Sequence, residues 1–362
     1  MIPMVDLKGQ YLTIKEEVDN GILETLDNTR FILGPNVQAF EKEAAEYLGV
    51  KHAVSCASGT DALHLALLAA GIKAGDEVIT SPFTFIATAE AIRYVGAKPV
   101  YVDIKPDTFN IDPDLIENAI TDKTTAILPV HIFGQPAQMQ AIMAIASKHN
   151  LKVIEDCAQS FGAQINGKMT GAIGLAGCHS FFPSKNLGCY GDGGMVTTND
   201  DEIAEQLRIL RNHGSSRQYH HDIIGYNSRL DEIQAVVLRI KLKRITDYNN
   251  GRRNAAHLYS KLLKDFVTPP HEDGIGTHIY HQYTVLTDKR DAIQEVLKEH
   301  DISSAVYYPI PLHKQKVFAN ECQGISLPVT EETARRCLSL PIFPELSNEQ
   351  VNTIVAAIKT AF

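Results

Sequence analysis

From about residue 55 to residue 199 the chain alternates short apolar runs with stretches of helical periodicity, and this alternation constrains the fold more than any other feature. The apolar runs carry the β-branched residues and the polar ends that are typical of strands. The predicted strands cover residues 53–57, 76–82, 99–104, 125–131, 152–155 and 194–199, and the predicted helices between them cover 58–68, 87–95, 112–120 and 137–149. This alternation predicts an α/β fold with a mostly parallel, doubly wound sheet.

The pattern beyond the sheet predicts a second, smaller domain. An amphipathic helix over 201–211 precedes a helical stretch from 230 to about 266 that leads away from the sheet. A strand over 281–286 and helices over 290–300 and 348–361 then indicate an α+β unit. Because 362 residues exceed a typical single domain, we expect a large domain over 1–245, including an N-terminal helix, and a small C-terminal domain over 246–362.

Charge, hydropathy and cysteine spacing argue against several classes of protein. A formal net charge of -9 argues against a nucleic-acid partner, because a polyanion binds to a basic face. No apolar run approaches the roughly 18 residues of a membrane span. The first residues lack the basic and apolar regions of a signal peptide, so we expect a cytoplasmic protein. The six cysteines show no paired spacing typical of a metal site, so we expect no metal.

One lysine stands in a turn between two strand-like runs. Lys185 lies within the segment His-Ser-Phe-Phe-Pro-Ser-Lys-Asn-Leu-Gly that begins at His179. A lysine is ordinarily a solvated ammonium, but beside aromatic residues and a bound anion it can lose its proton and form an imine with an aldehyde cofactor. Lys185 is therefore the candidate nucleophile.

Polar residues at other strand ends complete this set. Asp156 and Gln159 follow an apolar strand, and strand ends are where open α/β sheets hold their ligands. Gly59 and Thr60 begin a predicted helix, whose free N–H groups suit a phosphate, and Ser180 adds a hydroxyl. An imine-forming lysine, a carboxylate for a pyridinium nitrogen and a phosphate cradle together predict a pyridoxal 5'-phosphate (PLP) site.

The chain resembles the DegT/DnrJ/EryC1/StrS family of sugar aminotransferases nearly end to end. The motifs that carry the resemblance are Phe31-Ile-Leu-Gly-Pro35, Ser58-Gly-Thr-Asp-Ala-Leu63, Glu155-Asp-Cys-Ala-Gln-Ser160, the Lys185 segment, Asn227-Ser-Arg-Leu-Asp231 and Tyr308-Pro-Ile-Pro-Leu312. The resemblance implies fold type I of the PLP enzymes, like aspartate aminotransferase, with a large sheet domain flanked by helices and a smaller C-terminal α+β domain. Within the family, the segments 188–194, 219–221 and 309–312 are most similar to enzymes that aminate C3 of a UDP-linked 3-oxo-N-acetylglucosaminuronate.

The resemblance also implies roles for single residues. Lys185 would hold PLP as an imine, and Asp156 would pair with the pyridinium nitrogen. Phe85 would stack on one face of the ring, and Gln159 would contact the opposite face or the 3-hydroxyl. Asn227 would reach the phosphate bound by a neighbouring subunit, which implies a homodimer with composite active sites.

A basic stretch near residue 220 indicates where an anionic nucleotide sugar could bind. It includes His220, His221 and Arg229, and a guanidinium grips a carboxylate or diphosphate with two hydrogen bonds. The alternative is a solvated helix end and loop. Tyr307 and Tyr308 are further candidates for substrate contact. Tyr307 stands where the uronate enzymes that the chain resembles carry a histidine, so the sugar carboxylate has one candidate cation fewer.

The implied reaction is a PLP-dependent transfer of the amino group of L-glutamate to C3 of the UDP-linked 3-oxo-uronate, in the synthesis of precursors of cell-surface polysaccharide such as lipopolysaccharide O-antigen. Lys185 would act as the base in both half-reactions. Two alternatives stay open: a family aminotransferase for a C4-keto or dTDP-linked 3-keto sugar, and a non-catalytic regulatory homologue. The presence of Lys185 and Asp156 disfavours the regulatory alternative.

Overall fold

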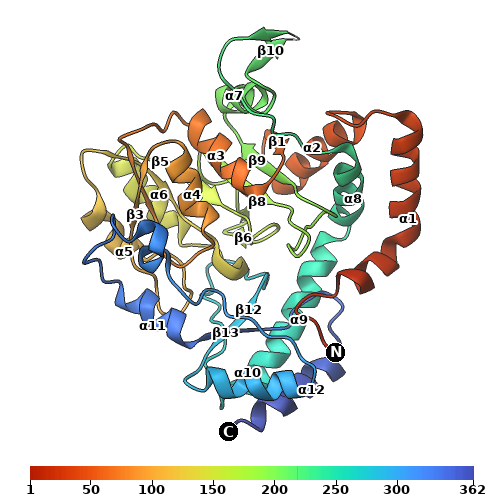
Figure 1. Cartoon of the computed structure of the whole chain (residues 1–362), viewed down its shortest axis with the longest axis vertical. Coiled ribbons are helices and arrows are strands. Elements are labelled where there is room, and N and C mark those ends of the chain that lie inside the picture. Colours follow the sequence, from red (N-terminus) through yellow and green to blue (C-terminus); the bar gives the residue numbers. More distant parts are fainter. Residues whose placement is uncertain (218) are drawn as a thin grey trace.

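The computed structural model of the protein describes residues 1–217 and 219–362 (Figure 1). A large α/β unit contains the central sheet, and a smaller α+β unit lies below it in Figure 1 and holds both chain termini. Among the described residues, no helix combines the length and the apolar character needed to cross a membrane.

A seven-stranded sheet forms the centre of the large unit, in the order β1-β9-β8-β5-β4-β2-β3. Its strands are β1 (His52–Cys56), β2 (Glu77–Thr80), β3 (Lys98–Tyr101), β4 (Thr124–Leu128), β5 (Lys152–Asp156), β8 (Ala176–Ser180) and β9 (Gly194–Thr198). β9 runs antiparallel to both of its neighbours, and the other pairs are parallel. The predicted mostly parallel sheet is therefore confirmed.

Helices cover both faces of this sheet, because successive strand residues point to opposite sides. In β4, Ala126 and Leu128 pack into the core beneath α3, α4 and α7, whereas Ile127 packs into the core beneath α5 and α6. These helices are α3 (Gly59–Ala69), α4 (Ala87–Tyr94), α5 (Pro113–Ile116), α6 (Met139–Lys148) and α7 (Asp201–Arg211). The carboxyl ends of the parallel strands stay free at one edge of this layer, where a ligand can bind.

Three helices support the sheet near β1 and β9: α1 (Leu7–Asn28), α2 (Pro35–Leu48) and α8 (Glu232–Leu242). Phe40 of α2 meets Phe181 edge to face, with ring centroids 5.3 Å apart. Because Phe181 directly follows β8, this packing anchors the start of the loop that carries Lys185.

The smaller unit is built around an antiparallel pair of strands. Its elements are α9 (Ile245–Leu263), β12 (Tyr283–Leu286), α10 (Arg290–Glu299), α11 (Pro328–Arg336), β13 (Cys337–Leu340) and α12 (Asn348–Lys359). The stacked rings of Tyr259 and Tyr283, with centroids 4.8 Å apart, lie in its core. A separate core indicates a second domain, as expected, while the boundary at residue 245 stays a prediction.

Two predicted helices differ in the structure. The stretch from 230 to about 266 is helical, but α8 and α9 are separate helices with Lys243 and Arg244 between them. The interruption has a packing reason, because α8 buries its apolar side against α1 and α2, whereas α9 belongs to the core of the smaller unit. The helix predicted over 112–120 ends early, since Asp112 caps the single turn of α5 and a 3-10 turn, η1 (Glu117–Ala119), follows.

Two short hairpins complete the described elements of the large unit. They are formed by β6 (Gln164–Ile165) with β7 (Lys168–Met169), and by β10 (Ser215–Arg217) with β11 (His220–His221). The second hairpin projects beyond α7, away from the rest of the molecule (Figure 1). It contains part of the basic stretch that the sequence marks as a candidate substrate site.

Candidate active site

A cavity of about 570 Å³ opens at the carboxyl ends of the sheet strands and is closed on one side by the smaller unit. The predicted site residues that line it are Gly59, Thr60, Phe85, Asp156, Gln159, Ser180, Lys185, Tyr307 and Tyr308. They come from the ends of four strands and from the segment before α11, so the fold brings together residues that are far apart in the sequence. This is the edge at which open α/β sheets hold ligands.

Lys185 stands in a tight loop between β8 and β9. Its backbone N–H donates to the carbonyl of Phe182 at 2.8 Å, and the loop requires Gly188, since a Cβ there would lie 2.4 Å from a backbone carbonyl oxygen. Behind the loop, the buried Lys241 donates from Nζ to the Gly188 carbonyl at 2.8 Å. Burial lowers the pKa of Lys185 to about 8, and the negative charge of Asp156 only partly opposes this. The Lys185 amine therefore loses its proton much more easily than an exposed lysine.

Asp156, the last residue of β5, is held by hydrogen bonds on both carboxylate oxygens. Ala158 N–H donates to Oδ1 at 3.1 Å, and Thr88 Oγ1 donates to Oδ2 at 2.8 Å. Thr84 Oγ1 lies 3.0 Å from Thr88 Oγ1 and must donate to it, because the Thr88 proton is already directed to a carboxylate. Burial raises the pKa of Asp156, while the two donors and Lys185 oppose the rise. The carboxylate is thus fixed in direction on the cavity wall.

The start of α3 forms a cradle beside the end of β8. Ser58 caps the helix, with its Oγ accepting from the N–H of Asp61 at 3.1 Å. A Cβ on Gly59 would lie 2.5 Å from the Cβ of Ser180, so only glycine permits this close approach. Thr60 and Ser180 place hydroxyls on the same wall as the first N–H groups of the helix, which have no intrahelical acceptor. Such a cradle suits a phosphate.

Gln159 and Tyr308 join the two units across the cavity. Phe133 N–H donates to Gln159 Oε1 at 2.7 Å, which orients the amide so that Nε2 donates to Tyr308 Oη at 3.1 Å. Tyr308 keeps its own proton, because burial raises the pKa of its hydroxyl. The ring of Phe85 lies 6.5 Å from that of Tyr308, at the cavity rim, where 57% of Phe85 is exposed. Phe85 is thus free to stack on a ligand.

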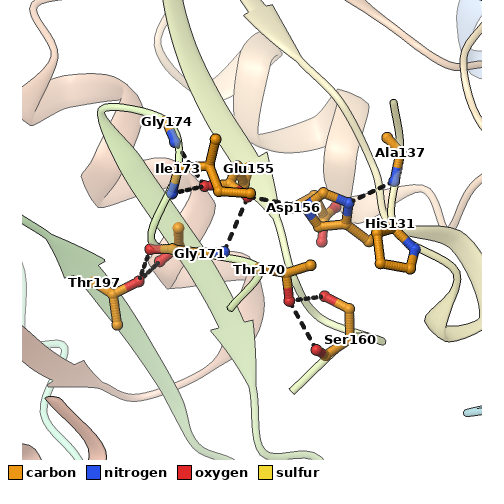
Figure 2. Close-up of polar contacts among 12 residues, drawn as sticks. His131, Ala137, Glu155, Asp156, Ser160, Thr170, Gly171, Ile173, Gly174 and Thr197 are labelled. Atoms are coloured by element: carbon orange, nitrogen blue, oxygen red, sulfur yellow. Dashed lines mark hydrogen bonds and ion pairs between the residues drawn. The ribbon is translucent and has the colours of Figure 1, made fainter. Parts of the chain in front are cut away.

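A buried polar network supports β5 next to Asp156 (Figure 2). His131 Nδ1 accepts from the N–H of Ala137 at 2.9 Å, so Nε2 carries the proton and donates to Glu155 Oε2 at 3.0 Å. Glu155 also accepts three backbone N–H groups, from Gly171, Ile173 and Gly174. Burial alone would raise the pKa of Glu155, but these donors lower it on balance.

This network does not fit a metal ion. His131, Glu155 and Cys157 each offer a ligand atom, and these atoms lie within 4.8 Å of one another. Both ring nitrogens of His131 are already hydrogen-bonded, and Glu155 accepts on both oxygens. Burial also raises the pKa of the Cys157 thiol, so the thiolate that a metal requires is disfavoured. The network instead ties β5 to the neighbouring loops.

The remaining predicted site residues lie outside this cavity. His220 and His221 form β11 and are exposed, and Asn227 is exposed as well. Arg229 Nη1 donates to Asn212 Oδ1 at 3.1 Å. Their predicted roles therefore stay predictions.

Several cavity residues were missed by the sequence analysis, among them Thr84, Thr88, Asp192 and His281. Thr88 carried a signal as a polar residue in the first turn of the helix predicted over 87–95, whereas Thr84 precedes that helix. His281 carried none, since it reaches the cavity only when the smaller unit packs against the sheet.

A lysine after β8, a carboxylate at the end of β5 and a phosphate cradle after β1, on this sheet, define a PLP enzyme of fold type I. The chain belongs to the DegT/DnrJ/EryC1/StrS aminotransferase family, whose sequence model matches residues 12–359. It is a PLP-dependent sugar aminotransferase.

Curated relatives match nearly the whole chain. It is 53% identical, over 99% of this chain and 97% of the relative, to a UDP-N-acetyl-3-dehydro-alpha-D-glucosamine 3-aminotransferase of Acidithiobacillus ferrooxidans. It is 46% identical, over 99% of both chains, to a UDP-2-acetamido-2-deoxy-3-oxo-D-glucuronate aminotransferase of Pseudomonas aeruginosa. It is also 51% identical, over 99% of this chain and 97% of the relative, to a protein of Geobacillus stearothermophilus named pleiotropic regulatory protein.

Solved structures show the same fold. DesV of S. venezuelae, in complex with a ketimine intermediate, matches with a TM-score of 0.97 and 42% identity, over 99% of this chain and 98% of that one. NtdA of Bacillus subtilis, with bound cofactor PMP, matches with a TM-score of 0.90 and 32% identity, over 96% of this chain and 81% of that one.

The cavity residues fit PLP. Among the described residues, Asp156 has no lysine, arginine or histidine nitrogen within 4.0 Å, so its buried carboxylate has room for a pyridinium partner. The Gly59–Ser180 cradle has the size and donors for a phosphate, and Lys185 supplies the amine.

Proposed function

We propose that the protein transfers the amino group of L-glutamate to C3 of a UDP-linked 3-oxo-N-acetylglucosaminuronate. The observation that carries the proposal is the position of Lys185, an amine of lowered pKa in one cavity with Asp156 and the phosphate cradle. The product would enter the synthesis of cell-surface polysaccharide precursors such as lipopolysaccharide O-antigen, in the cytoplasm.

PLP, when bound, supplies an aldehyde carbon and an electron-withdrawing ring. Lys185 would hold it through Nζ and, once released, would take and return the proton at the reacting carbon. Asp156 would keep a proton on the ring nitrogen, Phe85 would cover one ring face, and the N-terminus of α3 with Ser180 would bind the phosphate. Because these groups come from three strand ends and the start of one helix, they would hold the ring in place while Lys185 moves.

The choice of sugar rests on the relatives that are named for C3 amination of UDP-linked sugars. Those two names differ at C6, where a glucuronate carries a carboxylate and a glucosamine carries a hydroxymethyl group. A second candidate substrate is therefore the UDP-linked 3-oxo-N-acetylglucosamine. Tyr307 favours this second candidate, because it lines the cavity where a cation for the carboxylate would be expected.

The proposal includes a homodimer with composite sites. Asn227 of one copy would bind the phosphate in the cavity of the other, and Arg229, His220 and His221 would bring positive charge to the nucleotide sugar. The exposure of Asn227, His220 and His221 in the single chain supports this arrangement.

A trapping experiment tests the role of Lys185 with an internal control. The chain has a second buried lysine, Lys241, whose pKa burial also lowers to about 8 but which does not line the cavity. Addition of PLP, borohydride reduction and peptide mass spectrometry should label Lys185 and leave Lys241 free. Label on Lys241 alone would contradict the proposed site.

An absorbance experiment tests the substrates. A band of the bound cofactor near roughly 400 nm should be lost on addition of L-glutamate and return when the accepting sugar is added. Return with the 3-oxo-uronate supports the main proposal, and return with only the 3-oxo-N-acetylglucosamine supports the second candidate. Return with only a 4-keto sugar or a dTDP-linked 3-keto sugar would overturn both.

A further inference from the structure

His281 enters the wall of the active-site cavity from the smaller unit. It lies just before β12, is 4% exposed and lines the same cavity as Lys185. Neither the sequence motifs nor the proposed function gives it a role. The hydrogen bonds behind its ring determine what it can do.

A chain of amide hydrogen bonds fixes the proton on the ring. Asn249 Nδ2 donates to the Phe161 carbonyl at 3.1 Å, so Asn249 Oδ1 accepts from Asn186 Nδ2 at 2.7 Å. Asn186 Nδ2 also lies 3.3 Å from the Ile279 carbonyl, so Asn186 Oδ1 faces His281 Nδ1 at 3.1 Å. An amide oxygen only accepts, so Nδ1 of His281 must carry the proton and Nε2 keeps a lone pair.

The backbone of this segment is clamped as well. Arg252, buried in α9, donates from Nη1 to the carbonyls of Tyr280 and His281 at 3.3 and 3.2 Å. Tyr280 has a φ of 49°, an uncommon conformation for a bulky residue that persists only where its surroundings enforce it. His281 is thus held through its ring by Asn186 and through its backbone by Arg252.

The ring also resists protonation. Burial lowers the pKa of His281 well below its ordinary value, and the positive charges of Lys185 and Arg252 lower it further. Besides Lys185, the titratable groups that line the cavity around it are Asp156, Asp192, Tyr307 and Tyr308. His281 therefore stays a neutral imidazole, and its Nε2 has no hydrogen-bond partner within the described chain.

We propose that His281 is a positioning residue whose free Nε2 accepts an N–H of the unbound Lys185 amine when the lysine side chain turns toward it. The hydrogen bond directs the Lys185 lone pair toward the reacting carbon and moves no proton to the ring. The inference rests on the proposed role of Lys185 and adds an acceptor that aims it. Asn186, the residue after Lys185, links the ring to the lysine loop, so the two groups are placed together.

The protonation state can be measured without cofactor or substrate. Nitrogen-15 NMR of the apoprotein should show His281, assigned by its loss in His281→Gln, with the proton on Nδ1 and without titration down to about pH 5. In Asn186→Leu, which removes the acceptor of that proton, the preference for Nδ1 should be lost. A proton on Nε2, or titration near about pH 6.5, would overturn the inference.

The effect on Lys185 is tested by the rate at which apoprotein captures PLP at different pH values. An acceptor stabilises the ammonium, so its loss in His281→Leu should move the midpoint of the pH–rate profile down by roughly half to one pH unit. His281→Gln places an amide oxygen near the position of Nε2, so the midpoint should return most of the way to the wild-type value. An unchanged midpoint in His281→Leu, or an equal shift in both variants, would refute the role.

His278→Gln is the matched control. His278 is another buried histidine of the same segment, with its Nδ1 accepting from the N–H of Tyr280, but it does not line the cavity. This variant should leave the midpoint at the wild-type value, and a shift equal to that of His281→Leu would assign the effect to the fold alone. If the wild-type protein captures no PLP on Lys185, the proposed function fails first, and the NMR result still reports separately on the ring.

Discussion

The polar residues of the cavity wall differ in exposure from those of an outer stretch formed by His220, His221 and Asn227. On the wall, Asp156 and Gln159 are buried, and each is fixed by hydrogen bonds within the chain. In the outer stretch, His220 and His221 are exposed on the hairpin that projects from the molecule (Figure 1), and Asn227 is exposed beside the end of α7.

The difference in exposure divides the proposed site into two parts, the buried wall and the outer residues. The wall residues form a complete frame for a cofactor in one chain, because desolvated polar groups must be satisfied locally. The outer residues are free to meet a second copy or a charged ligand. A single chain should therefore hold the cofactor but complete its phosphate and sugar sites only in an assembly, and the variants below test that division.

Removal of the nucleophile should have the largest effect. Lys185→Ala is expected to lower the amino-transfer rate by on the order of 10⁴ or more, because both anchoring and proton transfer are lost. Lys185→Arg keeps the positive charge but cannot lose its proton, so it should be as inactive as the alanine variant. Measurable turnover by Lys185→Arg would mean that this position supplies charge and no nucleophile.

Removal of the buried carboxylate should come next. Asp156→Asn keeps the shape but loses the charge that holds a proton on the ring nitrogen, and we expect a rate loss of about 10²- to 10³-fold. Protonation of Asp156 has the same effect, so the wild-type rate should fall at low pH, through a pKa of Asp156 that burial raises and the bound pyridinium would lower. The pH–rate profile of Asp156→Asn should lack this fall at low pH. Steady-state rates between about pH 5 and 9 would show whether the fall persists in the variant.

What the sequence could predict depends on whether a feature follows from local pattern or from packing between elements. The mostly parallel sheet and the strand ends at Asp156 and Lys185 follow from local patterns, because each strand or helix carries its own periodicity. The resemblance to a family added further candidates such as Phe85, and the structure brings nine of the predicted site residues to one cavity.

The missed features all depend on packing between elements. The Thr84–Thr88–Asp156 relay forms because α4 starts beside the end of β5, and His281 reaches the cavity only through closure of the smaller unit. The division of 230–266 into α8 and α9 likewise reflects two cores that the helical pattern alone cannot distinguish.

Mixing of two inactive variants tests the outer residues. Asn227→Ala should lose activity if this side chain serves the neighbour's phosphate. A 1:1 mixture of Lys185→Ala and Asn227→Ala chains, allowed to exchange subunits, should recover about a quarter of the wild-type rate, because half of the dimers then contain one intact site of two. The unmixed variants provide the baseline. No recovery, despite subunit exchange verified by mass spectrometry, would place Asn227 and Lys185 in the same chain's site or outside any site.

Replacement of the hydroxyl that fixes Asp156 should have the smallest of these effects. Thr88→Val removes a hydrogen bond to a buried carboxylate at nearly constant volume, and we expect a roughly tenfold to hundredfold lower rate. Since the Thr88 hydroxyl lowers the pKa of Asp156, its loss should raise that pKa and move the acid limb of the pH–rate profile upward. Thr88→Ser keeps the donor and should retain the wild-type limb. If Thr88→Val also retains the wild-type acid limb, the Thr88 side chain only fills space. The cavity wall is then fixed by β5 and Ala158 without help from α4.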